Sequence, residues 1–479
     1  MMTRRAFFAK TAAAGAVSLT ASAWSRVFGA NDAIRVGVIG INNKGADHIE
    51  SFRKLPGVRV AALCDVDQTI LEREAEKFRK RGESIALYRD LRHMIDSIYI
   101  DAVVIAAPNH WHSLAAIWAC QAGKDVYVEK PVSHNIWEGH QLVKAARKYQ
   151  RIVQSGTQNR SDICLRGVKD YLQEGHLGKP LWAHGMWLRL RDPIGKVNGP
   201  QPIPPSVDYD LWSGPASLAP LMRKNLHYDW HWVWETGNGD MANLGVHQID
   251  DCRFLCGLTG NPRRVVSFGE RWAFDDDGQT PNTQFALFEY DIPLLIEIRN
   301  LPTKKGVNAE DQVRGVRAGE IIMCENGYFA GGRGGGWVYD LKGKRIKQFP
   351  GDGGGEHAAN FIEAMRRRDR SILHSEVEEG HYSAVNAHIA NISYRLGRRS
   401  TFEEVKAAVQ HCRPALERAV SIEAHAAANE IDLKRTPVVL GADLQFDAQQ
   451  ERFVGPLSYE ADMFLKRNDR EPFVVPDVV

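Results

Sequence analysis

The stretch Ala33-Ile34-Arg35-Val36-Gly37-Val38-Ile39-Gly40-Ile41-Asn42-Asn43-Lys44-Gly45 decides the fold of this chain. Its first half is almost continuously apolar, which is typical of a buried strand in a parallel sheet. A turn bounded by two glycines follows, and residues 46–55 then have a helical pattern. A strand, a glycine turn and a helix in this order cradle a phosphate, because free amides at the helix N-terminus face the anion. We therefore expect a parallel α/β domain that binds a dinucleotide.

The glycine turn and the strand after it indicate which dinucleotide is bound. Gly40 and Gly45 occupy the first and third glycine positions of the turn, whereas Asn42 stands at the second. Asparagine tolerates positive φ better than most residues, so we expect Asn42 to permit the turn. The next apolar run, residues 58–64, ends at Asp65. An acid there hydrogen-bonds the ribose hydroxyls and repels a 2′-phosphate, which favours NAD over NADP. A carboxylate that only caps the loop is the alternative for Asp65.

Two further buried strands end in residues suited to a cofactor. Residues 102–107 lead into Pro108, Asn109 and His112, and residues 124–128 lead into Glu129 and Lys130. Ligands of open parallel sheets bind beyond the carboxyl ends of the strands, so we expect these five residues at the cofactor. A lysine beside an oxidised nicotinamide experiences a like charge and partial burial, and both lower its pKa toward the range useful for proton transfer. A surface lysine in a loop is the alternative for Lys130.

The sequence resembles the glucose–fructose oxidoreductase / inositol dehydrogenase family (Gfo/Idh/MocA) over roughly residues 34–398. The resemblance rests on the glycine turn, on Ala107-Pro108 with His112, on Gly123-Lys124-Asp125-Val126-Tyr127-Val128-Glu129-Lys130-Pro131, and on Gly245-Val246-His247. It implies an N-terminal Rossmann domain with a doubly wound parallel sheet. It also implies a C-terminal α/β domain with a large, open, mostly antiparallel sheet that often forms an oligomer interface. The implied chemistry is NAD(P)-dependent and acts on sugars, cyclitols or related carbonyl compounds, with Lys130 near the reacting hydroxyl.

A helical pattern over residues 240–251 carries the second group of catalytic candidates. Asn243, His247 and Asp251 recur at every fourth position and share one face of the expected helix. The resemblance matches His247 to the family's catalytic histidine. Many members carry an acid where this chain has Asn243, and an amide cannot take a proton. Asp240 is a candidate replacement for that acid, and a helix N-cap is the alternative role for it.

The substrate candidates come from two other segments. Trp230, Trp232 and Trp234 alternate with His231 and other polar residues, and they project the same way if the backbone is extended. Such aromatic faces suit sugars, whereas a core or interface wedge is the alternative. Asn159 and Arg160 follow the last expected strand of the first domain, and the resemblance places that crossing at the border of the substrate pocket. A hinge cap is the alternative for these two residues.

The remaining pattern predicts four segments. They are a targeting segment (1–30), an NAD-binding domain (31–156), a substrate-binding and oligomerisation domain (157–400), and a helical extension with a tail (401–479). Strand-like runs recur in the second domain between turn-rich stretches, as in an antiparallel sheet, at residues 181–190, 263–272, 283–290, 294–300, 320–328 and 337–341. We expect the glycine runs 331–336 and 351–355 to be loops.

The first residues predict export. Arg4-Arg5 followed by Phe7-Phe8, an Ala-rich stretch and the triplet Ala21-Ser22-Ala23 forms a twin-arginine signal pattern, which places the protein in the periplasm or another extracytoplasmic compartment. The alternative is an accidental Arg-Arg pair. The apolar stretch is too short to be a stable membrane anchor. The route carries folded proteins, so the seven cysteines are expected to be free thiols.

Composition excludes other classes of partner. The 479 residues hold 61 Lys and Arg against 59 Asp and Glu, so no basic excess suits nucleic acid. Cysteine and histidine spacings predict no metal site.

We expect an NAD-dependent oxidoreductase that acts on a secondary hydroxyl of a sugar, glycoside or polyol. Lys130 and His247 would take the hydroxyl proton, and the cofactor would be held tightly and recycled, because an exported protein would lose a dissociating one. The partners expected are a small carbohydrate substrate and further copies of the chain in a dimer or tetramer. One alternative is a redox-neutral, NAD-dependent glycosidase that acts through transient oxidation and elimination. Another is a sugar-binding protein without activity.

Overall fold

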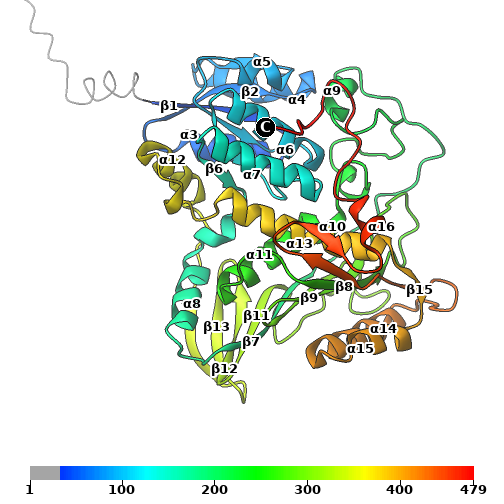
Figure 1. The fold of residues 1–479 in the computed structure, drawn as a ribbon. Helices are drawn as coiled ribbons and strands as arrows, with labels where there is room; N and C mark the ends of the chain where they lie inside the picture. Colours follow the sequence, from blue (N-terminus) through cyan, green and yellow to red (C-terminus); the bar gives the residue numbers. More distant parts are fainter. Residues whose placement is uncertain (1–32) are drawn as a thin grey trace, which may run out of the picture.

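The structure is a computed structural model, and it describes residues 33–479. The twin-arginine segment lies outside the described residues. Figure 1 shows two domains, an N-terminal one in blue and cyan and a C-terminal one in green to orange, with the long helix α13 (Val377–Arg395) running between them.

The N-terminal domain is a six-stranded parallel sheet in the order β3-β2-β1-β4-β5-β6, which confirms the doubly wound prediction. Its strands are β1 (Ile34–Ile39), β2 (Val58–Cys64), β3 (Ala86–Tyr88), β4 (Ala102–Ile105), β5 (Asp125–Val128) and β6 (Val153–Ser155). Its helices are α3 (Lys44–Arg53), α4 (Gln68–Lys80), α5 (Leu91–Ile95), α6 (Asn109–Gln121) and α7 (Ile136–Lys148). β1 and β4 are buried along most of their length, as expected for central strands covered on both faces.

The C-terminal domain is built on a larger, mostly antiparallel sheet, which confirms the second part of the predicted fold class. Its main strands are β7 (Pro180–Leu188), β8 (Arg264–Glu270), β9 (Thr283–Glu289), β10 (Pro293–Arg299), β11 (Ala318–Cys324), β12 (Gly327–Gly332), β13 (Gly335–Asp340) and β14 (Arg345–Pro350). Only β7 and β10 pair in parallel among these main strands of the described chain.

Two strand predictions in this sheet were wrong. Residues 320–328 are not one strand but the hairpin of β11 and β12. The glycine run 331–336 is a loop only at residues 333–334, because its first residues end β12 and its last residues begin β13. The two strands approach closely there: a Cβ on Gly331 would lie 2.4 Å from the Cα of Gly336. Glycine is therefore required at 331 by the close approach of two backbones, and at 334, where φ is 93°, by the turn of the hairpin.

Helices cover both faces of the large sheet. α11 (Gly245–Cys256) and α13 pack on the face toward the Rossmann domain, with Ile249 and Ile389 in one apolar cluster with Ile296 of the sheet. On the opposite face, α14 (Phe402–Val409) and α15 (Arg413–Ala428) cover Phe268 and Phe285. The extension thus covers part of the sheet face that the family resemblance assigns to subunit contacts. The other helices are α8 (Ile163–Gln173), α9 (Tyr209–Ser213), α10 (Gly239–Asn243) and α12 (His357–Arg367), with 3-10 turns at Gln158–Ser161, Asp229–Trp232 and Arg370–Ile372.

The C-terminal tail returns to the first domain. β15 (Arg398–Ser400), β16 (Val438–Leu440), β17 (Leu444–Asp447) and β18 (Arg452–Val454) extend the large sheet, and α16 (Ser458–Asp462) follows. The red segment in Figure 1 then runs up to the Rossmann domain, where Phe473 and Val475 join its core. Phe473 packs edge-on against Trp111 of α6 at 5.4 Å between ring centroids. The tail therefore ties the two domains together.

Glu451 attaches the start of this tail. Its carboxylate bonds His140 of α7 and His381 of α13, each at 2.8 Å. Within residues 33–479 these three side chains form a group whose ligand atoms lie close enough for a metal ion. The other ring nitrogen of His381, Nδ1, is buried without a partner there, whereas a metal-bound histidine donates that N–H to an acceptor. We therefore assign the group to attachment of the tail.

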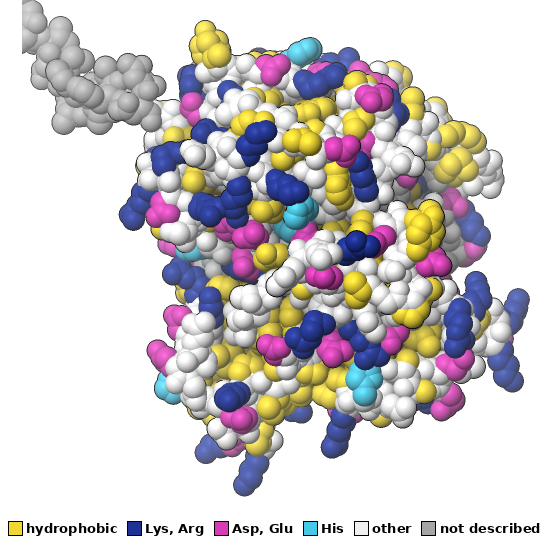
Figure 2. Space-filling view, in the orientation of Figure 1, with side chains coloured by type: hydrophobic (Ala, Val, Ile, Leu, Met, Phe, Trp, Pro, Cys, Tyr) yellow, Lys and Arg dark blue, Asp and Glu magenta, His cyan; other side chains and the backbone are white. Residues whose placement is uncertain are grey.

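Figure 2 shows basic and acidic side chains interspersed on the visible face, in keeping with the net charge of +2. No helix within residues 33–479 has the length and apolar character needed to cross a membrane. The seven cysteines form no disulfide in this part of the chain.

Candidate active site

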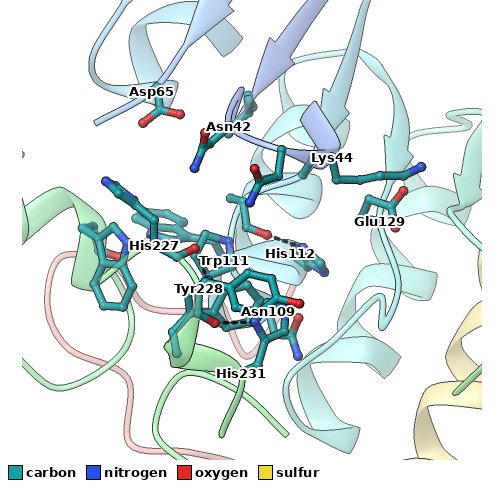
Figure 3. A pocket seen from close by; sticks show the side chains of 18 of the residues that line it. Asn42, Lys44, Asp65, Asn109, Trp111, His112, Glu129, His227, Tyr228 and His231 are labelled. Atoms are coloured by element: carbon teal, nitrogen blue, oxygen red, sulfur yellow. Dashed lines mark hydrogen bonds between the residues drawn. The ribbon is translucent and has the colours of Figure 1, made fainter. Parts of the chain in front are cut away.

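A cleft of about 400 Å³ opens at the carboxyl edge of the six-stranded sheet. One wall is the glycine turn with the ends of β2, β4 and β5. The other wall comes from the C-terminal domain, where residues 227–231 and 243–247 face the turn. Figure 3 shows Asp65, Asn42, Lys44 and Glu129 along the Rossmann side of the cleft, opposite Tyr228 and His231.

The turn has the close packing that a pyrophosphate cradle needs. Gly40 has φ +74°, and a Cβ there would lie 2.6 Å from the backbone nitrogen of Ala107. A Cβ on Gly45 would lie only 1.8 Å from the carbonyl oxygen of Gly40, so the helix can approach the strand only with glycine at this position. The strained residue is Asn43, at φ 37°, and not Asn42 as expected. Asn42 instead extends into the cleft and accepts a hydrogen bond from Arg73 at 3.1 Å.

Asp65 lies where a ribose-binding acid is expected. Its carboxylate accepts hydrogen bonds from the backbone N–H groups of Ile41 and Asp67, both at 3.0 Å, so it is fixed at the end of β2 beside the turn. Burial raises the pKa of Asp65, and these two amides oppose the rise. The turn and this acid together fit an NAD dinucleotide along the cleft.

Some of the residues that follow β4 and β5 line the cleft, and others bond neighbouring parts of the protein. Pro108 caps α6, and Asn109 donates to the side-chain oxygen of Asn238 at 3.2 Å across the domain boundary. His112 lines the cleft, but both of its ring nitrogens face backbone carbonyls, those of Pro131 and Ala107, at 2.6 and 2.7 Å. His112 therefore connects the two strand ends.

Glu129 also has a partner inside the protein. It bonds His48 of α3 at 2.8 Å, and Lys44 extends toward it. Although burial opposes ionisation, the hydrogen bond from His48 holds the pKa of Glu129 well below its usual range. Glu129 is thus a fixed negative charge next to Lys130.

Lys130 contacts the other domain through a break in a helix. The expected single helix over residues 240–251 is two helices, α10 and α11, separated at Leu244. In a continuous α-helix the carbonyl of Asn243 would accept from the N–H of His247. Here that N–H bonds Leu244 instead, at 3.1 Å, and the Asn243 carbonyl accepts from Lys130 Nζ at 2.6 Å. The side-chain oxygen of Asn243 accepts from the same nitrogen at 3.2 Å.

A carboxylate stands behind Asn243. Asp240 is almost fully buried, accepts from Asn243 Nδ2 at 3.2 Å and pairs with Arg191 Nε at 2.7 Å. The N-cap of α10 is Asn238, so Asp240 does not have the capping role considered for it. Lys130, Asn243, Asp240 and Arg191 form one continuous polar chain from the cleft into the C-terminal domain.

His247 lines the same cleft as Lys130. Burial, with the nearby positive charge of Lys130, lowers the pKa of His247 to about 3. The imidazole is therefore neutral near neutral pH. Its Nδ1 is buried without a partner among the described residues, which leaves this ring free to hydrogen-bond a ligand. Burial also lowers the pKa of Lys130, against the attraction of Glu129.

The tryptophan stretch does not form the platform that its alternation predicts. Residues 229–232 form a 3-10 turn, so alternate side chains do not point the same way. Trp230 lines the cleft and stacks on His231 at 3.6 Å between ring centroids. Trp232 is buried beneath Arg191, and Trp234 packs against Arg395. The prediction of three aligned tryptophans was wrong.

The structure separates the two residues that follow the last Rossmann strand. Asn159 donates to Asp251 Oδ2 at 2.7 Å and lines a second cavity. Arg160 lies in neither lining, because its buried guanidinium pairs with Asp250 of α11 at 2.8 Å and with Glu379 of α13 at 3.1 Å. Arg160 thus joins two helices, contrary to the expectation of a substrate contact.

Sequence reasoning missed the lining residues Lys44, Arg191, His227 and Tyr228. Lys44 stands inside the glycine turn and could have been found there. His227 bonds Asp67 of the Rossmann domain at 2.8 Å. No local pattern predicts that contact, because 160 residues separate its partners.

Comparisons with known proteins agree with this geometry. The oxidoreductase family's NAD-binding Rossmann fold (GFO_IDH_MocA) matches residues 34–157, and that family's C-terminal alpha/beta domain matches residues 162–269. A glycosyl hydrolase family 109 protein of Shewanella putrefaciens is 35% identical over 129 residues, 25% of this chain and 27% of that protein. Myo-inositol 2-dehydrogenase of Thermotoga maritima is 29% identical over 224 residues, 47% of this chain and 55% of that enzyme. The chain thus matches between 27% and 55% of the length of these two relatives.

Solved structures show the same fold. A levoglucosan dehydrogenase in complex with NADH superposes with a TM-score of 0.58 at 18% identity, over 75% of this chain and 96% of that one. The WlbA dehydrogenase of Bordetella pertussis, in complex with NADH and UDP-GlcNAcA, gives a TM-score of 0.55 at 19% identity, over 75% and 95% of the two chains.

Proposed function

We propose that this chain is an NAD-dependent enzyme that oxidises a secondary hydroxyl of a sugar, glycoside or polyol, because residues 34–157 and 162–269 match the two domains of the Gfo/Idh/MocA oxidoreductase family. One observation carries the proposal: Lys130 and His247 line the cleft that also contains the Gly40–Gly45 turn and Asp65. A dinucleotide with its phosphates at the turn would lie in the same cleft as both side chains.

Bound NAD supplies a hydride acceptor, and the protein's task is to orient the hydroxyl and receive its proton. Lys130 is the base, since burial lowers its pKa and Asn243 fixes its position. His247 is neutral and has an unpaired ring nitrogen, so it holds the same hydroxyl by a hydrogen bond. Asn243 cannot accept a proton, and Asp240 behind it supplies the negative charge for the chain Lys130–Asn243–Asp240.

The enclosure of the cleft supports a tightly held cofactor that is recycled within the enzyme. The segment around residues 206–231 crosses from the C-terminal domain onto the Rossmann domain, where Val207 and His227 both contact Asp67. Trp111, which lines the cleft, is held from behind by Phe473 of the tail. These contacts hold the two walls of the cleft together, which favours retention of a bound dinucleotide.

Denaturation of the purified protein tests this part of the proposal. We expect about one NAD or NADH per chain in the released small molecules, identified by mass spectrometry. In the same preparation, a panel of sugars and polyols is expected to reduce the bound cofactor, and Lys130→Ala to abolish the reduction. Protein that releases no dinucleotide and gains none on incubation with NAD contradicts the proposal. Sugar binding that is unchanged by Lys130→Ala, without turnover in either protein, identifies a binding protein instead.

The family 109 relatives favour a second candidate, a redox-neutral glycosidase. In that reaction the substrate hydroxyl is oxidised, the acidified neighbouring C–H is lost, the glycosidic oxygen leaves, water adds, and the returned hydride restores the cofactor. Incubation with aryl glycosides and no added oxidant separates the two candidates. Release of the phenol without net NADH supports hydrolysis, whereas NADH formed in proportion to oxidised sugar supports simple oxidation.

We also propose that the Arg4-Arg5 segment exports the protein in its folded state. Its test is the double variant Arg4→Lys/Arg5→Lys, with fractionation of the cells. The variant is expected to accumulate in the cytoplasm, and unchanged export contradicts the proposal. Assembly into a dimer or tetramer is a further part of the proposal, and sedimentation analysis of the purified protein tests it.

A further inference from the structure

A second cavity, of about 530 Å³, adjoins the cofactor cleft at His247. The two cavities share Leu244 and His247 in their linings. The walls of the second are α11, the strands β7 and β11, and the β12–β13 hairpin. Its volume lies within the range of small-molecule sites in proteins.

The inner wall of this cavity presents buried acceptors that have no donor. Glu320 of β11 is 0% exposed, and its carboxyl group bonds that of Asp251. Asn159 Oδ1 and Gln248 Oε1, which also line the cavity, have no hydrogen-bond partner among the described residues. Polar groups that are buried in native proteins are almost always satisfied, so a cluster of unsatisfied acceptors around one cavity indicates a ligand that donates.

Glu320 also has a close acidic neighbour. Asp251, which is 1% exposed, hydrogen-bonds Glu320, and its Oδ2 accepts from Asn159. Burial raises the pKa of Glu320, and the negative charge of Asp251 raises it further. The raised pKa of Glu320 favours a proton shared between the two carboxyl groups, and their other oxygens remain acceptors. A sugar hydroxyl, which both donates and accepts, complements such a pair.

The cavity lining also contains a hydrogen-bond donor. The indole of Trp187 lines the cavity, and its Nε1 is buried without a partner in this part of the chain. Three arginines also line the cavity: Arg189 and Arg317, which both pair with Glu310, and Arg333 of the β12–β13 hairpin. Polar donors and acceptors thus line the cavity, which is the pattern for a hydroxylated ligand and not for an apolar one.

We propose that this cavity is a subsite for a second sugar ring, so that the substrate is a glycoside of at least two rings. One ring lies at Lys130 and His247, and its neighbour lies against Glu320, Asn159 and Trp187. The inference rests on the proposed function. The geometry allows it because His247 and Asp251 are four residues apart on α11, about 6 Å along the axis, which is comparable with the size of one sugar ring.

Calorimetric titration of the purified holoprotein tests the proposal, because binding is measured independently of turnover. The probes are matched pairs: glucose with maltose, cellobiose and trehalose, galactose with lactose and melibiose, and mannose with mannobiose. At least one two-ring sugar is expected to bind about tenfold or more tightly than its one-ring partner, the effect of one or two buried hydrogen bonds. Equal or weaker binding of every two-ring sugar overturns the inference.

Two variants locate the subsite. Glu320→Gln is expected to weaken binding of the preferred two-ring sugar by about tenfold and to weaken binding of the one-ring sugar much less. Trp187→Phe, which removes only the N–H donor, repeats the measurement if Glu320→Gln does not fold. Glu325→Gln is the matched control, since Glu325 lies outside the cavity, where it accepts from the N–H of Lys179. Equal losses for both sugars, or an equal loss in the control, contradict the subsite. Failure of the subsite proposal leaves the proposed function intact if one-ring sugars still reduce the cofactor and the reduction requires Lys130.

Discussion

Lys130 has two roles: it connects the two domains, and it is the proposed base of the reaction. Two oxygens of Asn243 accept from its Nζ, and a neutral amine has two N–H donors, so its lone pair remains for the proton of a substrate hydroxyl. The sequence predicted Lys130 at the strand end and His247 on a helix. It did not predict their connection, because that depends on the break at Leu244, which frees the Asn243 carbonyl.

The pH dependence of sugar oxidation follows from the lowered pKa of Lys130. Only the neutral amine accepts a proton, so the rate is expected to rise with pH and to level off below the pKa of an ordinary lysine, about 10.4. Lys130→Arg should remove this rise, because a guanidinium stays protonated across the accessible range. The measurement is the pH profile of single-turnover rates in both proteins. A midpoint at the ordinary lysine value, or an unchanged profile in the variant, refutes the assignment of Lys130 as the base.

At the scale of single elements, periodicity predicted the parts that are packed on both sides. The apolar runs of β1, β2, β4 and β5 identified the Rossmann sheet, because central parallel strands need no alternation. The tryptophan stretch and the glycine run 331–336 were interpreted incorrectly for a shared reason. Their conformations depend on tertiary contacts, the first on Arg191 and the second on the close approach of β12 and β13.

The β1–α3 unit offers a direct test of the phosphate cradle. Gly45→Ala places a Cβ 1.8 Å from the Gly40 carbonyl, so α3 must shift away from the strand. We expect destabilisation of about 1–3 kcal/mol, as for overpacking elsewhere, together with loss of bound dinucleotide. Gly82→Ala is a suitable control, because a Cβ at Gly82 meets no atom within 4 Å, although its φ of +70° adds strain. Retention of the full dinucleotide content by Gly45→Ala argues against this turn as the cradle.

At the scale of the whole molecule, the C-terminal extension (residues 401–479) has two structural roles, neither of which the sequence predicted. α14 and α15 cover one face of the large sheet, and the tail crosses to the Rossmann core. Sequence could not show this, since the final residues have weak periodicity and contact segments hundreds of positions away. One example is Arg470, which bonds Asp210 at 2.6 Å.

We expect truncation of the Phe473 side chain, which attaches the tail to the Rossmann core, to speed dissociation of the dinucleotide. Phe473→Ala removes a side chain that is 1% exposed and packs on Trp111, so we expect a loss of about 3–5 kcal/mol in unfolding free energy. Because Trp111 lines the cleft, dinucleotide should also dissociate faster at temperatures where the variant is folded. Dilution of the holoprotein into a dinucleotide-degrading enzyme measures that rate. A variant that is destabilised but loses cofactor no faster than the wild type shows that the tail stabilises the fold alone.

The central claim is that Lys130 and His247 act on one hydroxyl beside one bound dinucleotide. Its most direct test is the rate at which the bound cofactor is reduced in a single turnover, with the most active sugar of the panel, in wild type, Lys130→Met and His247→Ala. We expect both variants to retain their dinucleotide and to lose about a hundredfold or more in rate, the contribution of a positioned base. Reduction at the wild-type rate in Lys130→Met, with its cofactor in place, would contradict the claim.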